Sequence, residues 1–124
     1  IGGVKGVQFG KGFDFADCLG SDANDAFEIK EGKVVTKTNN NGGINGGISN
    51  GMPIIFRVAM KPTPSIFKAQ NTVNLETMQE ETLSLKGRHD PAIFHRARVV
   101  VDSMTALALL DLLVQCFGER WLTE

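Results

Sequence analysis

The sequence contains little that would support a metal, redox or polyanion-binding function. Its two cysteines, Cys18 and Cys116, lie far apart and in no metal or redox spacing, so we expect reduced thiols in a cytosolic protein rather than a disulfide. The two histidines, His89 and His95, are too few and too isolated for a metal site. A formal net charge of -1 provides no global field that would attract nucleic acid or a membrane surface.

A signal peptide and an uninterrupted hydrophobic run are also missing. We expect the most apolar stretch, 99–117, to be a core helix rather than a membrane span. It is interrupted by the polar residues Asp102, Ser103, Thr105, Asp111 and Gln115. The 124 residues fit one domain, 1–124, which can bury roughly two-thirds of its unfolded surface. Because the chain begins with Ile1 rather than methionine, we expect a piece of a longer protein that holds the rest of the site.

Short strands are predicted along most of the chain. Residues 4–15 mix β-formers with glycine, which indicates a strand that bends or bulges, and the segment 17–27 has the turn and cap residues of a short helical turn. Alternation around Glu31-Gly32 predicts a hairpin. Residues 52–60 are too apolar for a strand with one face in water, so we expect a central strand. Residues 71–87 predict two strands separated by an acidic break at Glu80-Glu81.

One long helix is predicted from Pro91 to about Gly118. Apolar residues cover most of its circumference, so we expect it to be buried on two sides. The sequence therefore predicts an α+β protein in which one or more antiparallel sheets pack on a long buried helix.

The segment Asn39–Gly51 contains five glycines, which allow positive φ angles and close approach of the backbone to a flat ring or a phosphate. Taken alone, the segment favours a floppy surface loop over a binding site, because no P-loop or dinucleotide pattern is present. Lys61, followed by Pro-Thr-Pro-Ser, adds a cation and two hydroxyls that suit a phosphate or an anionic ring.

Arg88, His89 and Asp90 occupy consecutive positions just before the predicted helix. Asp90 immediately before a proline would make a good N-cap, and capping alone would explain it. The same geometry also gathers a helix N-terminus, a guanidinium and a carboxylate, which suits anion binding and proton handling. We expect His95 to lie on the surface in the first turn of the helix.

Three blocks together resemble the carboxyl-terminal part of the chorismate synthase family: VKGVQFGKGF, TNNNGGINGGISNGMPIIFRVAMKPTPSI and GRHDPAIFHRARVVVDSMTALALLDLL. They occur in the family's order and cover nearly the whole chain. The resemblance implies a lyase of the shikimate pathway that converts 5-enolpyruvylshikimate 3-phosphate to chorismate and phosphate. This 1,4-elimination requires reduced FMN without net redox change. The family fold implies a layered sandwich with helices between antiparallel sheets, of which this chain would form one half.

The resemblance also implies roles for individual residues. The family's flavin contacts fall on Gly2, Gly3, Gly46, Lys61, Pro62, Thr63, Pro64, Ser65 and Arg88. Arg88 would also reach toward the substrate, and Asp90 matches a carboxylate that assists proton transfer near the flavin N5. Family members are homotetramers, and the apolar helix would let the fragment alone form a dimer.

Some features depart from the family. Ala92, His95 and the pair Arg98-Val99 replace common family residues at the start of the helix, which alters packing more than chemistry. The family's amino-terminal part, with its Ser-His-Gly motif and most substrate-binding arginines, is not in this sequence, so we expect no turnover by this chain alone. Two alternatives stay open: a flavin- or phosphate-binding module without catalysis, and a structural half that dimerises through the helix.

Overall fold

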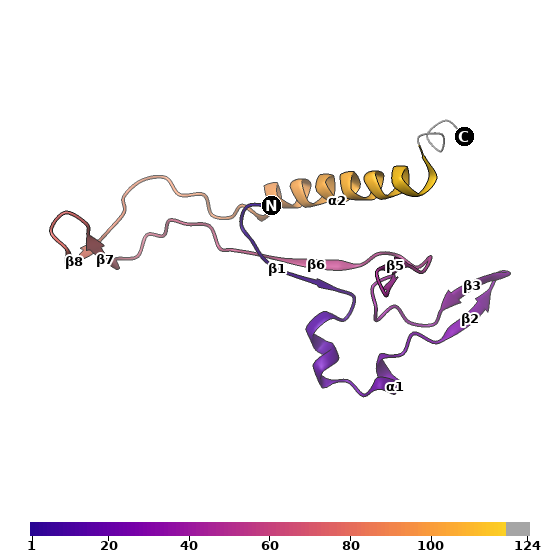
Figure 1. Cartoon of the computed structure of the whole chain (residues 1–124). Helices are drawn as coiled ribbons and strands as arrows, with labels where there is room; N and C mark the ends of the chain where they lie inside the picture. The colour runs from indigo at the N-terminus through magenta and orange to yellow at the C-terminus, as the bar shows by residue number, and fades with distance from the viewer. Residues whose placement is uncertain (119–124) are drawn as a thin grey trace. The chain divides into compact units, whose positions relative to one another are not determined.

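The computed structural model describes residues 1–118, which form an α+β chain of short antiparallel hairpins and a long helix (Figure 1). All four sheets of the described residues are two-stranded and antiparallel, which confirms the α+β class, whereas the packing of the sheets on the helix in a layered sandwich stays a prediction. The chain divides into an amino-terminal unit, Gly2–Met60, and a carboxyl-terminal unit, Lys61–Glu124 with Ile1, which are described separately. The last six residues of the predicted domain, 119–124, lie outside the described part.

The amino-terminal unit contains six strands and two short helical segments. In chain order these are β1 (Val4–Phe9), η1 (Gly12–Asp17), α1 (Gly20–Ala23), β2 (Phe27–Lys30), β3 (Lys33–Thr36), β4 (Ile44–Asn45), β5 (Ile48–Ser49) and β6 (Phe56–Met60). The predicted short helical turn is confirmed as α1. The predicted hairpin is β2–β3, whose turn residues Glu31 and Gly32 both have positive φ, 54° and 74°, as a two-residue hairpin turn requires.

Strand β1 pairs with β6, and its register shifts between Val4 and Gly6. This irregularity confirms the predicted bulge. The prediction of a central strand over 52–60 is wrong within the described residues, because β6 begins only at Phe56 and has β1 as its one strand neighbour there. Exposure alternates along β6, since Arg57 and the small Ala59 occupy the outward positions. The less exposed apolar residues of β6 therefore lie on one face of the strand.

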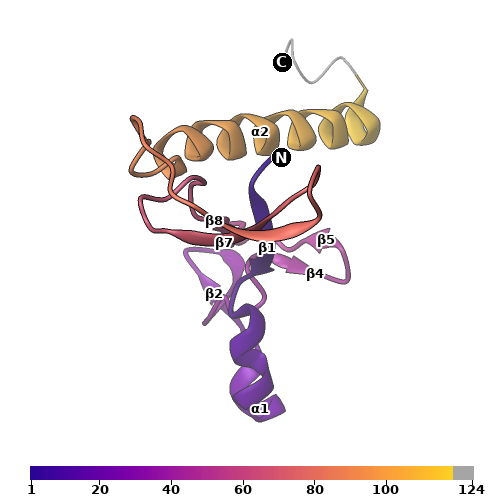
Figure 2. The same ribbon diagram turned by 90° about the vertical axis from the view of Figure 1, so that its left-hand side faces the viewer.

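The carboxyl-terminal unit contains the hairpin β7 (Gln70–Asn74) and β8 (Gln79–Leu83), whose strands run side by side in Figure 2. Two strands were predicted here, but the turn lies earlier than the acidic break. The side chain of Asn74 accepts hydrogen bonds from the N–H groups of Glu76 (2.9 Å) and Thr77 (3.2 Å), a local arrangement that starts a turn. Glu80 and Glu81 therefore lie within β8.

Helix α2 (Phe94–Phe117) begins three residues after the predicted start at Pro91. The carbonyl of Ile93 closes the first turn by accepting hydrogen bonds from Arg96 N (3.0 Å) and Ala97 N (2.9 Å). No side chain caps this end, so the N-cap interpretation of Asp90 is wrong. The predicted end is confirmed, because Gly118 has a φ of 70° and donates its N–H to the carbonyl of Val114 at 2.8 Å.

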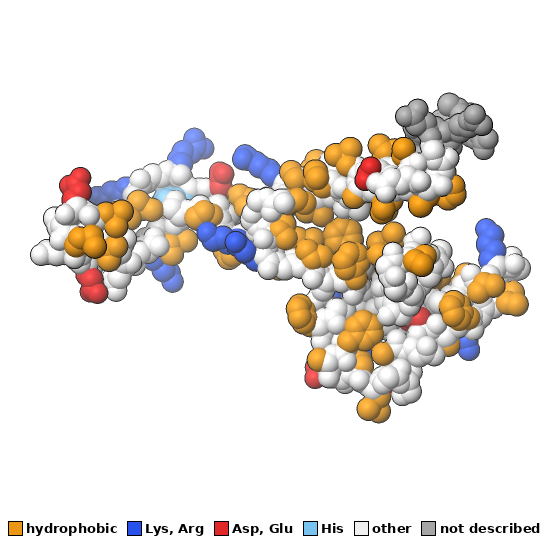
Figure 3. Space-filling model, in the orientation of Figure 1, with side chains coloured by type: hydrophobic (Ala, Val, Ile, Leu, Met, Phe, Trp, Pro, Cys, Tyr) orange, Lys and Arg blue, Asp and Glu red, His pale blue; other side chains and the backbone are white. Residues whose placement is uncertain are grey.

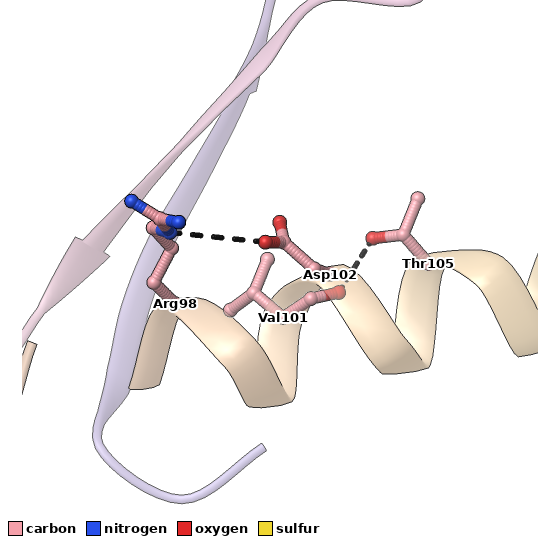
Figure 4. Close-up of polar contacts among 4 residues, drawn as sticks. All are labelled: Arg98, Val101, Asp102 and Thr105. Carbon is pink, nitrogen blue, oxygen red and sulfur yellow. Dashed lines mark hydrogen bonds and ion pairs between the residues drawn. The ribbon is translucent and has the colours of Figure 1, made fainter. Parts of the chain in front are cut away.

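The predicted burial of α2 on two sides is not found in the described residues. None of its residues is buried, and hydrophobic side chains are visible along it in Figure 3. Two polar contacts within the helix are drawn in Figure 4: Thr105 Oγ1 donates to the carbonyl of Val101 at 2.7 Å, and Arg98 Nε lies 3.9 Å from Asp102. Another contact joins Arg96 to Asp90, which precedes the helix, at 4.0 Å.

Within residues 1–118, α2 is the one helix that could cross a membrane by length and composition alone, with a mean hydropathy of 1.8. A core helix of a soluble protein has the same length and composition, so this property is weak support for a membrane span. The core-helix interpretation of this segment stays a prediction.

Candidate functional site

The glycine-rich segment is an ordered hairpin rather than a floppy loop. Strands β4 and β5 pair Ile44 with Ser49 and Asn45 with Ile48 (Figure 2). The two residues between them, Gly46 and Gly47, have φ angles of 57° and 81°. Positive φ at both central residues is the requirement of a type I′ turn, and glycine meets it without strain. We refer to residues 42–51 below as the glycine hairpin.

The glycines around this hairpin are of two kinds. Gly10, Gly42 and Gly43 are buried, and a Cβ atom added at any of them would lie within 2.5 Å of a backbone atom. These three are required for close packing of the chain on itself. A Cβ atom added at Gly46 or Gly47 meets nothing within 4 Å. The open pair at the tip therefore leaves backbone free to approach a ligand, and Gly51 at the end of the hairpin also has open space around it.

Asp25 holds the chain at the entry to the hairpin. One of its carboxylate oxygens accepts hydrogen bonds from Thr38 Oγ1 (2.7 Å) and Asn40 N (2.7 Å), and the other from Asn41 N (2.9 Å) and Asn41 Nδ2 (3.0 Å). Burial by itself raises the pKa of this carboxyl, but the hydrogen bonds from Asn41, Asn40 and Thr38 outweigh it, so the pKa lies below its ordinary value of 3.8.

The sequence prediction missed Asp25. It precedes an apolar strand, and its partners follow 13 to 16 residues later, so no local pattern links them. The cluster of three asparagines beside the first glycines was the available signal. Asparagines in turns commonly bond to nearby backbone, and such a cluster needs acceptors as well as donors.

In the carboxyl-terminal unit, a hydrogen bond joins two segments that were singled out separately in the sequence. Ser65 Oγ lies 2.6 Å from His89 Nδ1, which connects the Lys61–Ser65 segment to the Arg88–Asp90 segment. The ring of His89 also contacts Phe67 edge-on, with ring centroids 4.1 Å apart and planes at 70°. His89 Nε2 is buried and has no hydrogen-bond partner among the described residues.

The charged side chains of these two segments face solvent. Lys61 and Arg88 are exposed, whereas the hydroxyl-bearing Thr63 and Ser65 are half-buried. The side chain of Asp90 is 63% exposed and lies 4.0 Å from Arg96, at the limit of an ion pair. Cations and hydroxyl groups of this kind are able to bind a phosphate group.

The residues predicted for a site are therefore distributed over both units. Gly2, Gly3 and Gly46 belong to the amino-terminal unit, where Gly3 has a φ of 83° and a Cβ atom added at Gly2 meets nothing within 4 Å. Lys61, Pro62, Thr63, Pro64, Ser65, Arg88 and Asp90 belong to the carboxyl-terminal unit. Only the second group is joined by a described contact between its segments, through Ser65 and His89.

Together these features describe an α+β chain with an open glycine turn in one unit and exposed cations in the other. The family model described as chorismate synthase matches residues 1–114. The chain belongs to the chorismate synthase family.

Individual relatives agree with this assignment. The chorismate synthase of Methanobrevibacter smithii is 53% identical over 115 residues, which are 93% of this chain and 32% of that protein. The chorismate synthase of Pyrococcus abyssi is 54% identical over 121 residues, 98% of this chain and 33% of that protein. The chain thus spans about a third of the length of these relatives. A crystal structure of chorismate synthase matches 52% of this chain and 19% of its own, with 49% identity and a TM-score of 0.49.

Proposed function

We propose that this chain is the carboxyl-terminal part of a chorismate synthase. The reaction removes phosphate from 5-enolpyruvylshikimate 3-phosphate: a C–H bond and the C–O bond to phosphate break, a C=C bond forms, and the products are chorismate and phosphate. The observation that carries this proposal is the family match over residues 1–114, which includes both the glycine hairpin and the cationic segments. The enzyme is a lyase of the shikimate pathway, and we expect it in the cytoplasm.

The residues present suit a reduced FMN cofactor. The tip of the glycine hairpin offers backbone without side chains, since Gly46 and Gly47 have open space where a Cβ atom would be. The exposed Lys61, with Thr63 and Ser65, supplies charge and hydroxyl donors for a phosphate. When bound, reduced FMN would lend electron density to the substrate and recover it within the same turnover.

Two residues have roles in the reaction itself. The guanidinium of Arg88 would bind anionic groups of the flavin and of the substrate, because its planar donor set matches phosphate and carboxylate oxygens. Asp90 would hold and move a proton. Its exposure and its long contact with Arg96, 4.0 Å, leave the carboxylate available for that task. Asp90 has no capping role that would compete with it.

The chain alone is proposed to be inactive. It spans about a third of its relatives, and the remaining length would supply the missing histidines and substrate-binding arginines. In the whole enzyme we propose that residues 1–124 form one domain, in which α2 lies between antiparallel sheets of a layered sandwich. We further propose that the whole enzyme is a homotetramer.

Titration with FMN tests the cofactor assignment. We expect the whole native gene product to change the fluorescence of added FMN, and we expect Lys61→Ala to weaken this binding by about tenfold, the loss of one charge-assisted contact. Lys33→Ala is the matched control, because Lys33 is an exposed lysine in the β2–β3 hairpin, outside the proposed site. Equal affinities of Lys61→Ala and the unchanged protein would reject Lys61 as a flavin contact.

A second experiment separates the enzyme from the two alternative functions. The 124-residue chain is incubated with 5-enolpyruvylshikimate 3-phosphate and chemically reduced FMN, and chorismate is measured. We expect none, whereas chorismate formation would overturn the proposed inactivity of the chain. FMN binding without turnover by the whole gene product would favour a binding module. A dimer in sedimentation with no FMN response would favour a structural half.

A further inference from the structure

Asp25 is one of the few buried residues of the amino-terminal unit. The buried positions among residues 1–118 are Gly10, Asp25, Thr36, Gly42 and Gly43, and Asp25 is only 7% exposed. An ionised carboxylate removed from water is costly unless hydrogen bonds replace the water. Here donors from Thr38, Asn40 and Asn41 make the replacement. The chain therefore closes tightly around one carboxylate.

Hydrogen bonds on either side of the short backbone segment 39–41 connect this carboxylate to the glycine hairpin. Asp25 fixes the backbone of Asn40 and Asn41, and this segment includes Asn39. The side chain of Asn39 then accepts from Gly43 N (2.8 Å) and donates to the carbonyl of Pro53 (2.8 Å), which holds both ends of the hairpin.

Between these ends and the tip, Asn50 joins the two strands of the hairpin. Its N–H donates to the carbonyl of Gly43 at 3.0 Å, and its side chain donates to Asn45 Oδ1 at 2.6 Å, directly before the open glycines of the tip. Each of these contacts is short and polar, so the orientation of Gly46 and Gly47 at the tip depends on the hydrogen bonds around Asp25 and Asn39.

We propose that Asp25 is a positioning residue for the cofactor: by holding residues 38–41 it sets where the backbone of Gly46 and Gly47 meets the flavin. This inference rests on the proposed function and adds a residue that makes no contact with the cofactor itself. Gly46 and Gly47 provide an open backbone surface for the flavin, and Asp25 holds that surface in position. Burial by itself would raise the pKa of Asp25, but the hydrogen bonds from Asn41, Asn40 and Thr38 lower it, and these bonds favour the ionised carboxylate.

The four donors around Asp25 distinguish a carboxylate from an amide of the same shape. In Asp25→Asn, one oxygen is replaced by an NH₂ group in either of its two orientations. That group then faces the backbone N–H of Asn40 or the backbone N–H of Asn41, and neither is able to accept a hydrogen bond. At least one buried N–H loses its partner, which loosens the entry to the hairpin.

The test compares Asp25→Asn with Asp22→Asn in the whole gene product. Asp22 is an exposed carboxylate three positions away that accepts only a long bond from Ser21 Oγ, 3.5 Å, among the described residues. We expect Asp25→Asn to raise the reduced-FMN concentration needed for half-maximal rate by about tenfold, with kcat at saturating FMN within about threefold. A merely structural role would lower the amount of active enzyme without changing the FMN requirement. Asp22→Asn is expected to resemble the unchanged protein.

Amide hydrogen exchange provides a readout that does not need the cofactor. The N–H groups of Gly43 and Asn50 do not bond to Asp25, yet they take part in the hydrogen bonds described above. We expect both to exchange about tenfold faster in Asp25→Asn. If the unchanged gene product binds no FMN, the proposed function fails, and this exchange still decides whether Asp25 holds the hairpin. An unchanged FMN requirement with unchanged exchange at Gly43 and Asn50 would overturn the inference.

A milder variant covers the case in which Asp25→Asn does not fold. Thr38→Ala removes one donor, the hydroxyl at 2.7 Å, and keeps the carboxylate with its bonds to Asn40 and Asn41. We expect a smaller increase in the FMN requirement, about threefold, with kcat unchanged. The absence of any increase in this folded variant would count against Asp25 as a positioning residue.

Discussion

Replacing Gly42 with alanine tests whether the buried glycines serve packing and the tip glycines serve a ligand. A Cβ atom at Gly42 would lie 2.5 Å from Gly10 N and 2.6 Å from the carbonyl oxygen of Ile55. These two atoms bond to each other at 2.8 Å, and Ile55 N donates to the carbonyl of Gly42 at 3.1 Å. The added methyl group therefore meets backbone that is held in place, and no side chain is able to move aside for it.

The expected cost follows from two effects. Gly42 has a φ of 64°, where alanine is disfavoured by about 1–2 kcal/mol. Overpacking against fixed backbone adds about 1–3 kcal/mol, so the total is about 2–5 kcal/mol. Gly46 has a φ of 57° but open space around it, so Gly46→Ala keeps only the first cost, about 1–2 kcal/mol. The two variants thus separate packing from backbone conformation.

Hydrogen exchange at the amides of Gly10 and Ile55 measures the local effect in the whole gene product. A loss of 2 kcal/mol or more corresponds to roughly 30-fold faster exchange. We expect at least this change in Gly42→Ala and little change in Gly46→Ala, which should instead weaken FMN binding. Equal exchange in the two variants, or unchanged exchange in Gly42→Ala, would refute the distinction between the two kinds of glycine.

Three further predictions concern individual side chains and one pair of side chains in contact. Asp90→Asn should lower single-turnover chorismate formation on the order of 100-fold, the usual contribution of a positioned acid or base, with an unchanged melting temperature because Asp90 caps no helix. Asp102→Asn, which alters another exposed carboxylate, is its control, and a rate for Asp90→Asn close to that of Asp102→Asn would exclude proton transfer by Asp90. The Ser65→Ala and His89→Asn changes should couple by about 1 kcal/mol in a double-mutant cycle of FMN binding, and strict additivity would mean that their 2.6 Å contact is unimportant. Because the pKa of Asp25 is lowered in the folded protein, the stability that its carboxylate contributes should be complete above its unfolded pKa of about 3.9 and lost as pH falls through its folded pKa. The free energies of unfolding of the unchanged protein and of Asp25→Asn, measured with denaturant over this pH range, should therefore converge at low pH. A difference between the two free energies that does not change with pH would contradict the lowered pKa.

Features encoded by neighbouring residues were predictable from the sequence. The β2–β3 turn at Glu31-Gly32 and the helix end at Gly118 both depend on glycine with a positive φ at a defined position. The bulge in β1 follows from glycine within a run of β-formers. These signals are local, so a single sequence contains them in full.

Features decided by competing local signals or by distant partners were not predictable. The turn of β7–β8 was placed at two glutamates because charge suggested a break, whereas the side chain of Asn74 decides it through bonds to the next turn residues. Asp90 was expected to cap α2, but the helix starts from the carbonyl of Ile93. Asp25 was missed because its importance arises only when residues 38–41 fold back onto it.

The sequence predicts the candidate site as a set of segments, a prediction that stays untested, and the contacts between these segments were not predictable. The sequence identified Lys61–Ser65 and Arg88–Asp90 from their residue types. The contact between Ser65 and His89 required the structure, since 24 positions separate the two residues. The glycine segment was identified as a surface for a ring, yet its division into packing glycines and open glycines follows only from the space around each one.

Product formation by the whole native gene product tests the central claim most directly. The purified protein is supplied with 5-enolpyruvylshikimate 3-phosphate and reduced FMN without oxygen, and chorismate and phosphate are quantified over time. Our account predicts both products in equal amounts, with no formation when FMN is omitted. Phosphate release without chorismate, or no reaction with reduced FMN at saturating substrate, would contradict it.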